Sequence, residues 1–363
     1  MMRTKLMRAP LKYIQAEGSL KEFAAESADL GQRYLFVCSN SGLKGCQEGL
    51  EEGFEGTDAY RRYEVFKGIS SVGEIERMRA IVREDNIDVV VGVGGGSAID
   101  TAKATAYYEK KPVAIVPTVC ATDAPCTGLS VIYNDDHTFN SYLFYPRNPE
   151  FVLVDSAIIA KAPTRFLVSG MGDALGTYFE ARHCNRNDSP SLENGGITRS
   201  AMALCELCYK TLREYGYAAV QSSDLNAVTP ALDAIIEANT YLSGVGADNG
   251  GLAVAHSVYN GLTVLDELTA MHGECVAYGT LTQLIIEGAP KAEIEEVFNF
   301  CHEVGLPVTL AEMGITDATR LMPACEAACA PGESIHNMVG DVTPVQLYNA
   351  MITADKLGHK MFD

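Results

Sequence analysis

The order of apolar and polar positions along this 363-residue chain changes after Pro163. Before that point, short apolar and β-branched runs alternate with segments in which apolar residues recur every three or four positions. The short runs predict parallel strands, and the periodic segments predict the helices that connect them. The predicted strands are residues 34–38, 63–66, 88–93, 113–116 and 151–154. A helix is predicted at residues 72–84, and the alternation over residues 127–143 predicts a two-stranded β-ribbon.

From Pro163 onward, strand-like runs become rare and helical periodicity dominates to the end of the chain. Helices are predicted at residues 165–182, 198–215, 231–243, 251–262, 273–287 and 294–304. We therefore predict two domains. Residues 1–163 form an α/β domain with a Rossmann-like parallel sheet, and residues 164–363 form an all-α domain.

Three consecutive glycines, Gly94, Gly95 and Gly96, separate an apolar run from a helix-compatible segment at residues 98–108. Glycine lets a backbone approach a ligand closely, and the amides at a helix start favour an anion. We interpret this strand–glycine–helix joint as a cradle for a phosphate or a dinucleotide. It is neither the G-x-G-x-x-G fingerprint, whose third glycine is missing, nor a P-loop, since Gly-Lys-Ser/Thr is missing. The alternative is a tight turn without a ligand.

Charge and cysteine content narrow the class of protein. The formal net charge of −19 argues against nucleic acid or an anionic membrane as a partner, because both require a basic surface. No uncharged apolar run reaches the length of a membrane span, and the first 26 residues lack the apolar core of a signal peptide. The odd number of cysteines, 11, then predicts reduced thiols and a cytoplasmic protein. Cys205 and Cys208 fall within a helical pattern, which favours core packing over metal binding.

Three residues of the helical half are candidate metal ligands. Asp173 is expected near the start of an apolar helix, His256 on a helix rich in apolar neighbours, and His272 at a helix start. One carboxylate and two imidazoles suit a catalytic divalent ion with an open coordination position. Taken singly, each residue has another interpretation, because a helix cap or a hydrogen-bonded core histidine would explain it equally well.

Several motifs of the chain, in this order, resemble a known family. They are Gly94-Gly95-Gly96, Asp100-Thr101-Ala102-Lys103, Val116-Pro117-Thr118, Thr122-Asp123-Ala124-Pro125-Cys126, Gly170-Met171-Gly172-Asp173-Ala174, Ala255-His256, Asn260-Gly261-Leu262-Thr263 and His272-Gly273-Glu274. The chain is similar to the glycerol dehydrogenases of the metal-dependent, or iron-containing, alcohol dehydrogenase superfamily. The resemblance implies a dinucleotide-binding N-terminal domain and a helical, metal-binding catalytic domain.

The resemblance also assigns roles to single residues. It implies that Asp173, His256 and His272 bind one divalent metal, zinc in the glycerol branch and iron in others. It implies a polyol hydroxyl contact for Asp123. It places the NAD diphosphate and the ribose and nicotinamide contacts on Gly94, Gly95, Gly96, Ser97, Thr118, Thr122, Thr127, Leu129 and Tyr133. Members of the family commonly assemble as homo-oligomers, from dimers to octamers.

Two positions depart from the family pattern. Ser97 stands where glycerol dehydrogenases carry a lysine, so one cation near the phosphates is lost. Asn40 stands about where NAD-specific relatives place an aspartate that binds the adenosine ribose and repels a 2′-phosphate. That repulsion is absent here, so NAD is expected and NADP stays open.

The resemblance implies a metal-dependent oxidation of glycerol, or of a related 1,2-diol, to the hydroxyketone with NAD(P). The metal would act as a Lewis acid on the substrate hydroxyl. The alternatives are an NADPH-linked reductase of 2-oxo acids or aldehydes, a dehydroquinate-synthase-like lyase, and a metal- or nucleotide-binding module without activity. A further hypothesis is that Cys275, close to His272 in sequence, makes the protein sensitive to oxidation.

Overall fold

The computed structural model describes residues 3–363, and the chain divides into two compact units. The first, here called the sheet unit, contains Arg8–Phe166 and Ser222–Gly244. The second, here called the helical unit, contains residues 3–7, Leu167–Gln221 and Val245–Asp363. These units follow from the packing of the chain, and the limits 1–163 and 164–363 stay a prediction for the folding domains.

The sheet unit is built on a six-stranded sheet in which every pairing is parallel, in the order β1-β8-β5-β4-β2-β3. This confirms the predicted α/β class and all five predicted strands of the sheet. The strands are β1 (Lys12–Ala16), β2 (Arg33–Cys38), β3 (Tyr60–Val65), β4 (Val89–Gly94), β5 (Val113–Pro117) and β8 (Phe151–Asp155). Because helices cover both faces, the central strands are apolar throughout, and every residue of β4 is buried.

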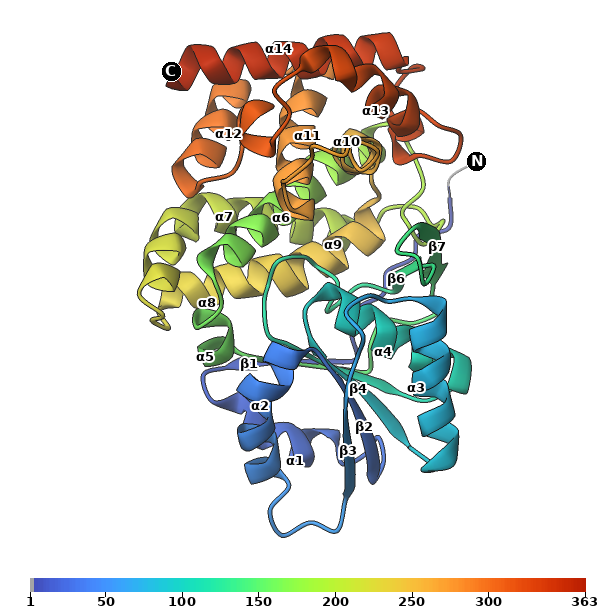
Figure 1. Cartoon of the computed structure of the whole chain (residues 1–363). Helices are drawn as coiled ribbons and strands as arrows, with labels where there is room; N and C mark the ends of the chain where they lie inside the picture. Colours follow the sequence, from blue (N-terminus) through green and yellow to red (C-terminus); the bar gives the residue numbers. More distant parts are fainter. Residues whose placement is uncertain (1–2) are drawn as a thin grey trace. The chain divides into compact units, whose positions relative to one another are not determined.

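Helices α1 (Phe23–Ser27) and α2 (Asn40–Gly53) lie on one side of the sheet, and α3 (Val72–Glu84) and α4 (Gly96–Glu109) lie on the other (Figure 1). The sheet unit also contains α5 (Ser156–Ala160) and α8 (Pro230–Glu237). An aromatic core that includes Phe23, Tyr34 and Phe36 lies between α1, α2 and one face. On the other face, Gly92 of β4 lets α4 approach closely, since an added Cβ would lie 3.0 Å from the Ala102 side chain.

The predicted β-ribbon is confirmed as the antiparallel pair β6 (Leu129–Tyr133) and β7 (Phe139–Phe144). It is anchored on α4 through Asp100, whose Oδ2 accepts from the Val131 amide at 3.1 Å. The Lys103 ammonium, itself buried, lies 3.4 Å from Asp100 Oδ1 and donates to the Ala124 carbonyl at 2.9 Å. This pair therefore ties the loop before the ribbon to the helix that follows the glycines.

The helical unit confirms the predicted all-α architecture. Its helices are α6 (Thr164–Arg186), α7 (Arg199–Asp224), α9 (Ser243–Gly250), α10 (Val254–Leu262), α11 (His272–Ile286), α12 (Lys291–Val304), α13 (Leu321–Ala328) and α14 (Pro344–Phe362). Residues 231–243, predicted as one helix, include all of α8 after its first residue, a π-helical turn at Ala238–Leu242 and the first residue of α9. The start predicted at residue 251 is wrong, because Gly251 has φ +82° and α10 begins only at Val254.

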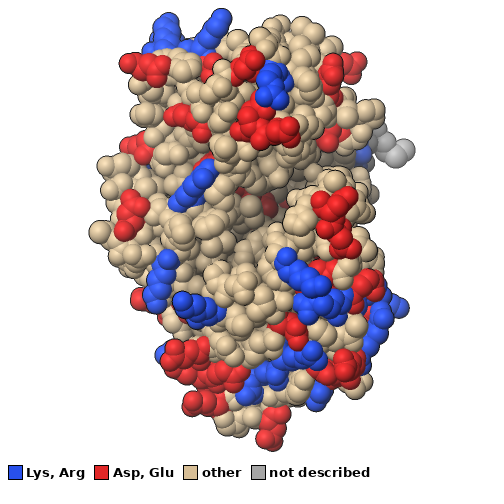
Figure 2. Space-filling view, viewed as in Figure 1, with Lys and Arg blue, Asp and Glu red and all other residues tan. Residues whose placement is uncertain are grey.

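Three further features are the surface charge, the state of the cysteines and the character of the helices. On the face that Figure 2 shows, Lys and Arg are interspersed with Asp and Glu. The cysteines are all free thiols, and Cys205 and Cys208 are fully buried in α7, which confirms their interpretation as core residues. Among residues 3–363, no helix combines the length and the apolar character needed to cross a bilayer.

Candidate metal centre and nucleotide cradle

Three helices of the helical unit bring Asp173, His256 and His272 together. One ligand atom from each residue lies within 4.8 Å of the other two. Asp173 Oδ1 is 3.1 Å from His272 Nε2 and 3.4 Å from His256 Nε2. A tetrahedral zinc ion with ligands at 2.0–2.1 Å would separate its ligand atoms by about 3.3–3.4 Å. The spacing of these donors therefore fits one small divalent ion.

Glycines permit the helices that carry the three residues to approach this closely. A Cβ on Gly273 would lie 1.7 Å from the Ser169 carbonyl oxygen, and a Cβ on Gly172 would lie 2.2 Å from the Gly273 carbonyl oxygen. The start of α11 thus packs backbone to backbone against the middle of α6. His272 reaches Asp173 because of this contact.

The structure corrects the expected position of Asp173. Helix α6 begins at Thr164, so Asp173 lies in the helix interior, 1% exposed, and its interpretation as a helix cap is wrong. The other two candidates lie where the sequence predicts: His256 is in the first turn of α10, and His272 is the first residue of α11.

The protonation of this cluster is set by its own charges. Burial acts to raise the pKa of Asp173, but the two imidazoles, His272 foremost, hold the pKa of this carboxyl well below its usual range. Burial acts to lower the pKa of His256, but the Glu180 and Asp173 carboxylates raise it well above its ordinary value. The cluster thus keeps an ionised carboxylate beside a protonated imidazole. A metal ion that binds there would have to displace a proton from that imidazole.

Glu180 belongs to this centre and was missed by the sequence analysis. It is fully buried on α6, and its Oε2 lies 2.6 Å from His256 Nδ1. The available signal was its spacing, because it follows Asp173 by seven residues, two helical turns along the same face.

Cys275 follows the centre in sequence and is fully buried. Burial raises the pKa of the Cys275 thiol to about 12. Since the thiolate is the form that oxidants attack, this environment argues against the hypothesis of oxidation sensitivity at Cys275.

The glycine segment lies at the carboxyl end of β4 in the sheet unit. Gly94 has φ +152°, and a Cβ there would lie 2.9 Å from the side chains of Ala98 and Ser39. Gly95 is the N-cap of α4, so the next amides, those of Gly96 and Ser97, belong to a helix start and have no partner within the helix. Gly95, Gly96 and Ser97 are only half-buried, as a phosphate cradle requires.

Other predicted cofactor residues lie around this segment. The Thr118 amide donates to the Gly94 carbonyl at 3.0 Å. A Cβ on Gly96 would lie 3.8 Å from Thr122 Oγ1. Asn40 is exposed at the start of α2, directly after the strand that pairs with β4. The fold thus brings the end of β2, the three glycines and the start of the loop after β5 together at the carboxyl ends of the strands.

The remaining predicted residues follow along the loop and the ribbon. Thr127 is buried, with its Oγ1 at 3.4 Å from Lys103 Nζ. Leu129 and Tyr133 are half-buried on one face of β6. Asp123 is half-buried, and its Oδ2 accepts from Ser243 Oγ at 3.3 Å. Ser243 was not predicted, because a contact across 120 residues has no local signal.

Comparisons with known proteins find relatives of this chain along nearly its whole length. Residues 10–156 match the family model described as iron-containing alcohol dehydrogenase. The chain is 46% identical over 359 residues to a glycerol dehydrogenase of Escherichia coli, with 98% of each chain covered. It is 47% identical over 354 residues to a glycerol dehydrogenase of Thermotoga maritima, with 96% of each covered. A solved structure of a probable glycerol dehydrogenase from Sinorhizobium meliloti superposes with a TM-score of 0.92 at 38% identity, over 99% of this chain and 100% of that one.

Proposed function

This chain belongs to the iron-containing alcohol dehydrogenase family, and from that premise we propose that it is a metal-dependent polyol dehydrogenase. It is an oxidoreductase with a small-molecule alcohol as substrate. The proposed reaction moves a hydride between NAD(P) and glycerol, or a related 1,2-diol, and gives the hydroxyketone. The glycerol dehydrogenases that share nearly half of its sequence, end to end, support this substrate class.

The observation that carries the proposal is the cluster of Asp173, His256 and His272. These residues would hold one divalent ion. Zinc is the proposed ion rather than iron, as the resemblance to the glycerol dehydrogenases implies. When bound, the ion supplies Lewis acidity, which makes a substrate hydroxyl easier to deprotonate. Three protein ligands leave a coordination position for that hydroxyl.

The chain's own residues would orient the two reactants. The amides after Gly95 would hold the cofactor diphosphate, and Thr118 and Thr122 border that cradle. Asp123 would accept a hydrogen bond from a polyol hydroxyl, with its carboxylate held by Ser243. This contact would favour a polyol over a simple alcohol. Hydride acceptance is the chemistry of the nicotinamide itself.

NAD is the proposed cofactor, with NADP as an outcome that the experiment must separate. The cytoplasm is the proposed location, supported by the free thiols of all 11 cysteines. A homo-oligomer is the proposed assembly, as the family resemblance implies.

The test is a set of initial rates with the zinc-loaded protein. Glycerol, 1,2-propanediol, a simple secondary alcohol and a 2-hydroxy acid would each be assayed with NAD and with NADP. We expect efficient turnover of glycerol or 1,2-propanediol, and we expect His256→Ala to lose both bound metal and turnover while it keeps its helical circular dichroism spectrum. Full activity of His256→Ala would refute the metal assignment. Turnover of only the 2-hydroxy acid with NADP would replace the proposal with a 2-oxo acid reductase.

A further inference from the structure

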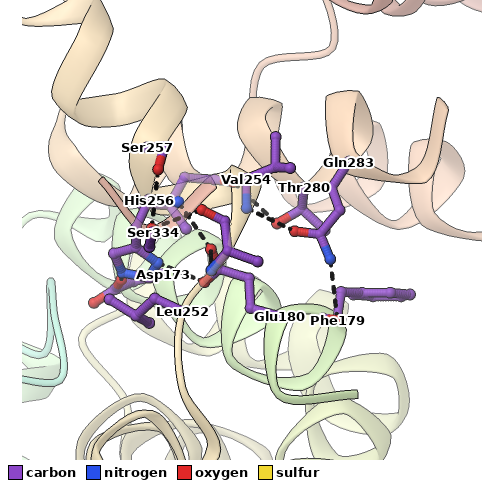
Figure 3. A network of polar contacts seen from close by, with 12 residues as sticks. Asp173, Phe179, Glu180, Leu252, Val254, His256, Ser257, Thr280, Gln283 and Ser334 are labelled. Carbon is purple, nitrogen blue, oxygen red and sulfur yellow. Dashed lines mark hydrogen bonds and ion pairs between the residues drawn. The ribbon is translucent and has the colours of Figure 1, made fainter. Parts of the chain in front are cut away.

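Glu180 is a fully buried carboxylate in the middle of the helical unit (Figure 3). A buried carboxylate is expensive to desolvate unless its oxygens are paired, so its partners are informative. Both oxygens of Glu180 are engaged, and all three contacts lead to the start of α10.

The two oxygens have different partners. Oε1 accepts from two backbone amides, that of Ala253 at 2.8 Å and that of His256 at 3.0 Å. These amides belong to the start of α10, which has no side-chain cap of its own. Oε2 lies 2.6 Å from His256 Nδ1. The carboxylate therefore holds both the backbone and the imidazole of the same histidine.

This contact decides which ring nitrogen faces the other candidate ligands. An ionised carboxylate only accepts hydrogen bonds, so Nδ1 must donate its proton to Glu180. In the neutral imidazole Nε2 is then the unprotonated nitrogen, and Nε2 is the atom that lies 3.4 Å from Asp173 Oδ1. We propose that Glu180 is a positioning residue for the metal centre, which fixes the tautomer and the ring orientation of His256 so that Nε2 binds the ion. This inference rests on the proposed function of Asp173, His256 and His272 as metal ligands.

His272 is oriented by other means. It begins α11, and its ring packs edge-to-face against Tyr259 at a centroid distance of 4.2 Å. The two imidazoles thus depend on different neighbours. A change at Glu180 should disturb His256 while the contact between His272 and Tyr259 stays in place.

Substitution of Glu180 by glutamine separates positioning from simple packing. The amide has nearly the same shape, and its carbonyl oxygen can still accept from the Ala253 and His256 amides. Its NH₂ group then faces Nδ1, which must become an acceptor, so the proton moves to Nε2 and blocks metal binding. If the amide is flipped instead, the NH₂ group meets the two backbone N–H groups and the α10 start loses its acceptor. Either arrangement disfavours the metal-binding state of His256.

The experiment measures the zinc dissociation constant by competition with a chromogenic chelator, for the wild type and for Glu180→Gln. We expect zinc to bind roughly 10–100-fold more weakly to Glu180→Gln, because this is the usual effect of losing the hydrogen-bond partner of a metal-bound histidine. The matched control is Glu287→Gln, because Glu287 Oε1 also contacts a histidine in the same unit, with His183 Nδ1 at 3.1 Å. We expect Glu287→Gln to bind zinc within about twofold of the wild type, because its histidine is not a metal ligand.

Equal zinc affinity of Glu180→Gln and the wild type would overturn the inference. Failure of the wild type to bind zinc at all would instead overturn the proposed function. A second measurement does not need any variant to fold. In the zinc-loaded wild type with ¹⁵N-labelled histidine, we expect the His256 ring to show a bound proton on Nδ1, with a strongly downfield shift, and coordination through Nε2. Coordination through Nδ1 would overturn the inference.

Discussion

At the scale of single residues, Asn40 is the position that we expect to govern the choice between NAD and NADP. Asn40 is exposed at the first position of α2, and the Ser39 hydroxyl caps that helix through the Gly42 amide at 3.0 Å. The Ser39 amide in turn donates to the Val93 carbonyl at 2.9 Å, so the start of α2 is tied to the end of β4. This is the position from which a side chain can contact the adenosine ribose of a dinucleotide held at the glycines.

Asn40→Asp tests that placement. The two side chains have the same shape, but the carboxylate would repel the 2′-phosphate of NADP and accept hydrogen bonds from the ribose hydroxyls of NAD. We expect the ratio of kcat/KM for NAD to that for NADP to rise about tenfold or more, equivalent to about 1.4 kcal/mol. Steady-state kinetics with both cofactors measure the ratio.

Asn40→Ala serves as the control, since it removes the side-chain amide without adding a charge, and its ratio should stay near that of the wild type. An unchanged ratio in Asn40→Asp would mean that the start of α2 does not face the cofactor's adenosine ribose.

At the scale of elements, close helix contacts create the candidate metal centre. Gly172 and Gly273 allow α6 and α11 to touch through their backbones, and Gly279 does the same for α11 and α10, where a Cβ would lie 2.5 Å from the Ala255 carbonyl oxygen. Each contact lies beside one of the candidate ligands along the chain. The geometry of the three ligands therefore depends on helix spacing as much as on the ligands themselves.

Gly273→Ala should destabilise the helical unit and separate the ligands. The added Cβ would meet the Ser169 carbonyl oxygen at 1.7 Å, and backbone atoms cannot move aside without shifting a whole helix. We expect a loss of stability of about 3 kcal/mol, at the upper end for overpacking, together with weaker zinc binding. Urea unfolding and chelator competition measure the two effects.

Gly45→Ala is the matched control, because Gly45 lies within α2 and a Cβ there would have no neighbour within 4 Å. That variant should be at least as stable as the wild type, since alanine favours a helix by about 1 kcal/mol over glycine. Wild-type stability and zinc affinity in Gly273→Ala would show that α6 and α11 are not constrained by this contact.

The elements that the sequence predicts well are those with strong local patterns. Helix α3 has the predicted bounds of 72–84, because its apolar spacing is regular and Ser71 caps its start. The strand β1 was not predicted, since its five residues mix polar and apolar types and it lies at the edge of the sheet, paired only with β8. Edge strands lack the continuous apolar run that marks a buried strand.

The candidate site was only partly predictable for a different reason. Asp173, His256 and His272 could be singled out through the family resemblance, but no spacing in the sequence shows that three separate helices meet. Glu180 and Ser243 act through contacts with residues distant in sequence, His256 and Asp123. The spacing of Glu180 from Asp173 is a weak local signal, and Ser243 has none. Such partners emerge only from the packed fold.

At the scale of the whole molecule, the metal ion and the dinucleotide proposed for this chain are assigned to different units. The candidate metal ligands all belong to the helical unit, and the proposed glycine cradle belongs to the sheet unit. The arginines of the sheet unit do not form a free basic surface around α3, because Arg62, Arg77 and Arg79 are each paired with carboxylates. We therefore expect binding of the anionic cofactor to depend on backbone amides more than on these arginines.

This division predicts that zinc and NAD stabilise different parts of the chain. A ligand that binds only the folded state stabilises it by about 2.7 kcal/mol at a hundredfold excess over its dissociation constant. With zinc alone, amide hydrogen exchange should slow most in α6, α10 and α11. With NAD alone, it should slow most at the end of β2 and across the glycines into α4. His256→Ala should lose the zinc effect and keep the NAD effect, which separates loss of the metal from general unfolding. Zinc protection confined to the sheet unit would contradict the assignment of the metal to the helical unit, and NAD protection absent from the glycines would contradict the cradle.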